Sequence, residues 1–310
     1  MKLIIFISFI FSIILDITLS EYPNYIHPVF YIGCVGKFFD KILKREKFKN
    51  KFLLVFLGFL SLILEIIIWL FLIIIFEYML KITFFNSQIF IYYLIYSIFY
   101  IFILKSTFSI KALYNHVKNC DTENIEELRK NVSKIVSRNT SILNQNQLYS
   151  AALESLSENI HDSIIGPHFY FMLFGLKGAF IYRIINTYDA LFGYRNEKYE
   201  YFGKTHARLD DFFNFIPARI SCFIMFFFNP KSVIKYIKKY GRIKINSTLP
   251  MSAFAGILKL GFEKKDYYKF NGKLPQKEDI NRGLKIFTKI AIIWISLIII
   301  IQLIIILKNM

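Results

Sequence analysis

Long apolar runs constrain the fold of this chain more than any other feature of its sequence. Residues 52–76, 89–104 and 290–307 are each about long enough to cross ~30 Å of hydrocarbon as a helix, and residues 3–19 form a fourth, weaker run. The run at residues 3–19 could also be a cleaved signal peptide, although Asp16 near its end favours retention. The sequence predicts an all-α, polytopic membrane protein with about four full spans, in which residues 1–310 form a single integral membrane domain.

The distribution of basic residues predicts the topology. The net charge is +17, and residues 19–51 and 105–285 hold 7 and 28 of the 39 lysines and arginines. Positively charged loops stay in the cytoplasm, so both segments are expected on the cytoplasmic side of the cell membrane and both chain ends on its outer side. Because the charge lies between spans, we expect no nucleic-acid partner. The lysines could simply solvate the surface, or they could attract an anionic substrate.

Two further apolar stretches lie inside the long basic segment. Residues 164–185 are interrupted by Gly166, Pro167, Gly175 and Arg183, and residues 220–228 are too short to span. We expect re-entrant or interfacial helices here, since irregular backbone at membrane depth is tolerated where it lines a cavity. The alternative is a fifth and a sixth span. Segment 105–285 is then a large cytoplasmic or membrane-surface region, with helices at 119–137 and 147–159 and a basic amphipathic segment at 230–242.

The densest polar segment of the chain covers residues 186–219. Asp189, Asp210 and Asp211 are candidate Mg²⁺ ligands and catalytic groups, because this ion binds carboxylates and bridges them to substrate phosphates. Arginine forks suit phosphate oxygens. The candidate residues for binding substrate or phosphate are Asn186, Arg195, Glu197, Arg208, Asn214 and Arg219. The same side chains could instead form salt bridges that close helix ends.

A second group of polar residues precedes that segment. The helix predicted at 147–159 places Glu154 and Glu158 one turn apart on one face, and Arg138 lies upstream. Arg138 is a further candidate for binding substrate or phosphate. The two glutamates are candidate catalytic groups that could bind a metal ion or an amine, or they could be solvated acids of a capped helix. Glu65, inside the second span, is a functional candidate or a contact with a neighbouring helix.

At these residues the sequence resembles the adenosylcobinamide-phosphate synthase family, the CobD/CbiB membrane proteins of cobalamin assembly. The matching strings are IVSRNTS at 135–141, ALESLSEN at 152–159, NTYDALFGYRNEKYEYFG at 186–203 and ARLDDFFNFIPAR at 207–219. The resemblance covers about residues 15–285. It departs from the family pattern at Ser20-Glu21-Tyr22, at Ile245, and at Met251 in place of a usual Glu.

The resemblance implies an ATP-dependent amide ligation in cobalamin biosynthesis. Adenosylcobyric acid would be joined to aminopropanol or aminopropanol phosphate, with Mg²⁺ and ATP as cofactors. Asp189, Asp210 and Asp211 would then hold the metal, and Glu154 or Glu158 would bind or deprotonate the amine. The corrinoid, the amine and the lipid membrane are the expected partners, together with other membrane-bound cobalamin enzymes. Two competing hypotheses are a non-catalytic subunit that organises corrinoid enzymes and a Mg²⁺-dependent membrane phosphotransferase.

Overall fold

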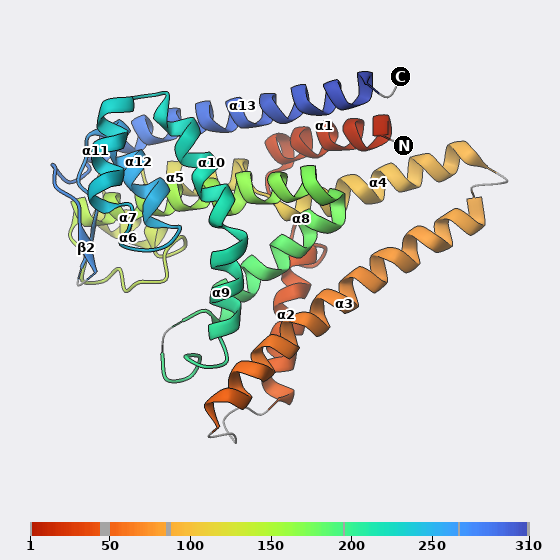
Figure 1. Ribbon diagram of the computed structural model, residues 1–310. Coiled ribbons are helices and arrows are strands. Elements are labelled where there is room, and N and C mark those ends of the chain that lie inside the picture. Colours follow the sequence, from red (N-terminus) through yellow and green to blue (C-terminus); the bar gives the residue numbers. More distant parts are fainter. Residues whose placement is uncertain (1, 44–49, 85–87, 195, 266, 309–310) are drawn as a thin grey trace. The chain divides into compact units, whose positions relative to one another are not determined.

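The computed structural model describes residues 2–43, 50–84, 88–194, 196–265 and 267–308, and almost all of its regular structure is helical (Figure 1). The predicted all-α membrane fold is therefore confirmed. Contacts between residues divide the chain into two compact units. The first unit contains Met1–Phe108, Pro167–Phe213 and Gln302–Met310, and the second contains Ser109–Gly166 and Asn214–Ile301. Each unit is thus built from segments that lie far apart in the sequence.

The first unit is built around a long apolar helix. Its helices are α1 (Lys2–Leu19), α2 (Pro28–Ile42), α3 (Lys51–Phe84), α4 (Ile89–Thr107), most of α8 (Gly166–Phe192) and α9 (Lys204–Phe213). Helix α3 packs against α2, α4 and α9, and α1 packs against α4. Helix α9, which carries part of the polar segment, is therefore fixed by a helix from the N-terminal third of the chain.

Two buried carboxylates connect helices of the first unit. Asp16 on α1 pairs with Lys105 on α4 at 3.0 Å, and both side chains are buried. Glu65 on α3 accepts hydrogen bonds from the Trp69 indole at 2.9 Å and from the Tyr188 hydroxyl on α8. A buried charge without a partner is costly, so these contacts specify which helices lie together. Of the two interpretations of Glu65, the structure supports the contact with a neighbouring helix.

The second unit surrounds helix α7. Its elements are α5 (Lys111–Lys118), α6 (Ile125–Val132), α7 (Gln145–Ile160), a π-helical turn (His161–Ile165), α10 (Phe215–Phe226), α11 (Pro230–Tyr240), α12 (Thr248–Leu258), β1 (Glu263–Lys264), β2 (Tyr268–Lys269) and most of α13 (Lys277–Leu307). Helix α7 packs against α5, α6 and α12, and α11 packs against α12. Strands β1 and β2 form a short antiparallel pair.

Side-chain caps decide where the helices of the second unit begin. Asn144 accepts the amide of Gln147 at 2.9 Å, and the Gln147 side chain accepts the amide of Asn144 at 3.0 Å, which completes a capping box for α7. The helix predicted at 147–159 is thus confirmed. The helix predicted at 119–137 is wrong in extent, because Asn124 caps the amides of Glu126 and Glu127 and only Ile125–Val132 is helical.

Five segments within the described residues are long and apolar enough to cross a membrane: Lys2–Leu19, Lys51–Phe84, Ile89–Lys118, Gln145–Phe192 and Lys277–Leu307. The multi-pass character is confirmed. The segment beyond the four predicted spans is Gln145–Phe192, which contains the stretch predicted to be broken. Gly175, at φ 66° and ψ −156°, interrupts the helical backbone there, in a conformation that side chains with a Cβ rarely adopt.

Candidate functional site

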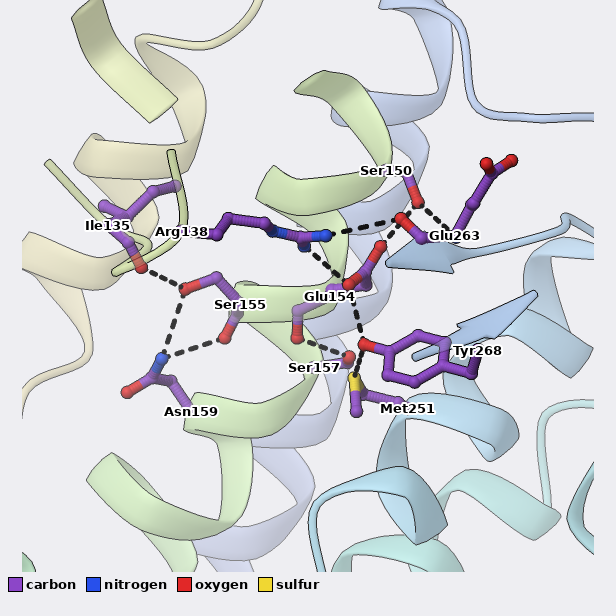
Figure 2. Close-up of polar contacts among 10 residues, drawn as sticks. All are labelled: Ile135, Arg138, Ser150, Glu154, Ser155, Ser157, Asn159, Met251, Glu263 and Tyr268. Atoms are coloured by element: carbon purple, nitrogen blue, oxygen red, sulfur yellow. Dashed lines mark hydrogen bonds and ion pairs between the residues drawn. The ribbon is translucent and has the colours of Figure 1, made fainter. Parts of the chain in front are cut away.

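The carboxylate of Glu154 is the centre of a buried polar network in the second unit (Figure 2). Its Oε2 lies 2.6 Å from Arg138 Nη2 and accepts the hydroxyl of Tyr268 at 2.7 Å, and its Oε1 accepts the hydroxyl of Ser150 at 2.6 Å. Only 3% of Glu154 is exposed. With three donors on its two oxygens, Glu154 has the partners that a buried charge requires.

The network joins segments that are distant in the sequence. Arg138 also donates to the carbonyl of Glu263 on β1 at 3.3 Å, and the amide of Glu263 donates to the Ser150 hydroxyl at 2.9 Å. Burial, followed by the negative charge of Glu154, raises the pKa of the Tyr268 phenol well above its usual value of 10.0. Tyr268 therefore stays protonated and donates to Glu154, so β1 and β2 are held against α7.

A pocket of about 150 Å³ lies beside this network. Glu158, one helical turn after Glu154, is half-buried and lines it together with Lys244 and Lys264. Burial lowers the pKa of Lys264, and the positive charges of Lys244 and Arg138 lower it further. Met251 also lines the pocket, with its sulfur 3.5 Å from the Tyr268 hydroxyl. The departure from the family pattern at Met251 thus lies in the pocket wall.

The polar segment of the first unit forms a second candidate site. Asn186 on α8 donates to Asp210 on α9 at 3.3 Å, and Arg183 lies 3.5 Å from the Asn186 side-chain oxygen. A pocket of about 460 Å³ is lined by Gly193, Tyr194, Glu200, Tyr201, Gly203, Lys204, Ala207, Arg208 and Asp211. The structure therefore places Arg208 and Asp211 in one pocket, and it joins Asn186 to the neighbouring Asp210.

Three other predicted residues of this segment are placed differently. Asp189 is half-buried near the end of α8, where its carbonyl accepts the amide of Gly193 at 2.7 Å. Glu197 is exposed, and Arg195 lies outside the described residues. Within the described ranges, no three His, Cys, Asp or Glu side chains gather where they could hold a metal ion. Asp189, Asp210 and Asp211 accordingly do not form a preassembled set of three ligands.

The segment is anchored to α3 by a buried histidine. His206 on α9 lies 2.9 Å from the carbonyl of Gly58, and its ring contacts that of Tyr188 at 5.1 Å between centroids. Burial lowers the pKa of His206 to about 4, so the imidazole is neutral at physiological pH. A Cβ at Gly58 would overlap the carbonyl oxygen of Phe202. These close contacts fix the beginning of α9 against α3.

Asn214 and Arg219 belong to the second unit. Asn214 is buried just before α10. Arg219 donates to Asn246 Oδ1 at 2.6 Å and to the carbonyl of Phe215 at 2.8 Å, and its guanidinium lies 3.6 Å from the centre of the Phe215 ring. These contacts give Arg219 a structural role in holding α10 near the segment before α12.

Sequence reasoning missed most partners of Glu154 and most residues of its pocket. Ser150, Lys244, Lys264 and Tyr268 were not predicted as site residues, and Tyr268 is more than a hundred residues from Glu154 in the sequence. No spacing pattern links residues so far apart. The one available signal was the departure at Met251, which pointed to the region that lines this pocket.

Comparisons with known proteins identify the family. The model of the CobD/Cbib protein family matches residues 9–293. The chain belongs to the CobD/Cbib protein family. Relatives named probable cobalamin biosynthesis protein CobD include one from Thermococcus kodakarensis, which is 41% identical over 94% of each chain. Another, from Pyrococcus furiosus, is 42% identical over 91% of this chain and 93% of its own.

Membership of the CobD/Cbib family assigns the chain to cobalamin biosynthesis. A third relative of the same name, from Methanocaldococcus jannaschii, is 37% identical over 87% of this chain and 90% of its own. No solved structure matches the chain. The family match spans both polar groups, so a role in cobalamin biosynthesis is established for the chain as a whole and agrees with its multi-pass membrane character.

Proposed function

We propose that the chain is an ATP-dependent ligase that joins a corrinoid carboxylate, that of adenosylcobyric acid, to the amine of aminopropanol or aminopropanol phosphate. The position of Glu158 in the pocket beside Glu154 is the observation that carries this proposal. Glu158 provides a carboxylate in a pocket of about 150 Å³, beside the Glu154 whose oxygens already accept three donors. A carboxylate in such a place can hold an ammonium group or accept its proton.

The reaction requires activation of a poor electrophile. Transfer of the terminal phosphoryl group of ATP to the corrinoid carboxylate gives an acyl phosphate and ADP. The amine nitrogen then attacks the acyl carbon, the C–O bond to phosphate breaks, and inorganic phosphate leaves as the amide forms. The nitrogen loses a proton to a base, and we assign that role to Glu158. Glu154, predicted as an equal candidate, is assigned to holding Arg138 and Tyr268 in position.

The pocket of the first unit supports binding of phosphates. Arg208 and Lys204 supply positive charge to its wall, and Asp211 supplies a carboxylate. Magnesium that arrives with a nucleotide needs only one or two protein carboxylates, because waters and phosphate oxygens complete its octahedron. The adjacent Asp210 and Asp211 fit that requirement, and a bound Mg²⁺ would neutralise phosphate charge. Asp189 is the third candidate ligand.

Variants of the acidic residues test the proposal. We expect the double variant Asp210→Asn/Asp211→Asn to lose amide formation by at least a hundredfold, because two charges near the phosphates are removed. We expect Glu158→Gln to reduce it by about 10²–10⁴-fold, the usual contribution of a general base. The matched control is Glu126→Gln, an exposed acid on α6. Wild-type rates in the acidic variants would contradict the roles assigned to these acids. Absence of amide formation by the folded wild-type protein would support the non-catalytic subunit, and ATP turnover without an amide product would support the phosphotransferase.

We also propose that the polar segment faces the cytoplasm, where ATP is available. Lys198 lies in this segment and is exposed, so Lys198→Cys provides a site for a thiol probe. Cys34 is exposed as well and must first be changed to Ser, whereas Cys120 and Cys222 are buried. A membrane-impermeant maleimide should label Lys198→Cys only after the cytoplasmic face is opened. Labelling of intact cells would contradict this topology.

A further inference from the structure

The pocket beside Glu154 carries more positive than negative charge once its internal ion pair is formed. Arg138 and Glu154 neutralise each other at 2.6 Å. Three charged side chains of the wall are left: Lys244, Lys264 and Glu158. In the part of the chain that the structure describes, neither Lys244 nor Lys264 forms an ion pair. The pocket therefore presents two ammonium groups and one carboxylate to whatever enters it.

The positive charges of the two lysines repel each other across the pocket. Lys264 is half-buried on β1, and its pKa is lowered by burial and by the charges of Lys244 and Arg138. Lys244 reaches the same pocket from the exposed segment before α12. A ligand with two negative charges would relieve this repulsion and form charge-assisted hydrogen bonds to both ammonium groups.

We infer that this pocket binds the phosphate group of a small phosphomonoester, with Lys244 and Lys264 as the phosphate ligands and Glu158 as the partner of an ammonium group on the same molecule. This inference rests on the proposed function, and it assigns the phosphorylated amine to this pocket. A volume of about 150 Å³ suits a molecule of this kind. Pockets for larger, drug-sized ligands have volumes of roughly 300–1,000 Å³.

Arg138 adds to the preference of the pocket for a negatively charged group without binding phosphate directly. Its guanidinium is held between Glu154 and the carbonyl of Glu263, so its positive charge is fixed at the pocket wall. The β1–β2 pair carries Lys264 and Tyr268, and Tyr268 donates to Glu154. The buried network thus sets the position of the strand that brings Lys264 to the pocket.

Equilibrium binding to the purified full-length protein in detergent tests the site. The probes are O-phosphoethanolamine, ethanolamine, inorganic phosphate and ATP. We expect Lys264→Gln and Lys244→Gln each to weaken O-phosphoethanolamine binding by about tenfold or more, since each removes a charge-assisted hydrogen bond. Lys264→Arg should retain most of the affinity. The matched control is Lys238→Gln, an exposed lysine of α11 in the same unit, which should bind like wild type.

Glu158→Gln separates the two ends of the ligand. We expect it to weaken O-phosphoethanolamine binding and to leave inorganic phosphate binding unchanged or tighter. Ethanolamine, which lacks the phosphate, should bind at least tenfold more weakly than its phosphate ester. ATP should compete poorly, and its residual binding should not depend on Lys264.

Three results would overturn the assignment: no binding of O-phosphoethanolamine to folded wild-type protein, equal affinity in wild type and Lys244→Gln/Lys264→Gln, or lysine dependence for ATP alone. Thermal unfolding of each variant shows whether it is folded. Because binding is measured without turnover, the lysine-dependent binding would stand even if no amide were formed. In that case the proposed function would fail and the phosphate site would not.

Discussion

Removal of the Arg138 side chain is the sharpest test of the buried network. Arg138→Met keeps much of the side-chain volume but leaves the Glu154 carboxylate, 3% exposed, without its cation. Breaking a buried ion pair from one side costs roughly 3–5 kcal/mol. Because Glu154 keeps the hydroxyls of Ser150 and Tyr268, and 16% of the Arg138 side chain is exposed to solvent, we expect the lower end, about 3 kcal/mol.

Thermal unfolding in a mild detergent measures this cost. For a chain of 310 residues, with an unfolding entropy of about 2.1 cal/mol/K per residue, 3 kcal/mol corresponds to a Tm lowered by about 5 °C. The matched control is Lys269→Met, which breaks an ion pair to Glu263 at 3.2 Å in which the lysine side chain is 72% exposed. An exposed pair contributes at most about 1 kcal/mol. The double variant Arg138→Met/Glu154→Gln should recover part of the loss, because it removes the unpaired charge.

Two results would refute this reasoning about the network. One is an equal decrease in Tm for Arg138→Met and Lys269→Met, which would mean that burial of Glu154 adds nothing. The other is a double variant no more stable than Arg138→Met alone, which would mean that the loss comes from packing of the arginine side chain.

Three further outcomes are expected. The pKa of His206 is lowered from 6.5 to about 4, so the stability that the neutral imidazole contributes is fully present above pH 6.5. The free energy of unfolding decreases as the pH falls toward 4, by at most about 3 kcal/mol. His206→Gln should therefore reduce the difference in Tm between pH 7 and pH 5. Gly58→Ala should lower the Tm because its Cβ would overlap the carbonyl of Phe202, whereas Gly33→Ala, whose Cβ would only make an ordinary contact with Leu191 at 3.9 Å, should not. Tyr268→Phe should weaken O-phosphoethanolamine binding severalfold through Lys264, and wild-type affinity would show that Tyr268 does not position β1.

The membrane fold could be predicted because lipid places simple demands on sequence. Runs of apolar residues identify helices regardless of what they contact. The break at Gly175 was also expected, since glycines and charges interrupt the stretch from 164 to 185. The length of α6 was overestimated, because the side-chain cap at Asn124 starts the helix later than the charge pattern indicates.

The candidate sites were predicted only in part. Arg208 and Asp211 are three residues apart, so their placement in one pocket follows from the sequence, whereas Asn186 and Asp210 are 24 residues apart and meet only through tertiary structure. The role of Arg219 could not be read from its residue type, because its partner Asn246 is recruited by the packing of α10 on α12. Lys264 and Tyr268 reach α7 through the β1–β2 pair, a contact that depends on tertiary structure alone.

The most direct measurement of the central claim is product formation by the purified protein. The protein is incubated with ATP, Mg²⁺ and adenosylcobyric acid, with aminopropanol in one reaction and aminopropanol phosphate in another, and the products are identified by mass spectrometry. The proposed ligase activity predicts a corrinoid that has gained the amine with loss of water, formed in step with ADP and phosphate, and faster with the phosphorylated amine. Absence of that product with both amines, from folded protein in lipid, would contradict the proposed function.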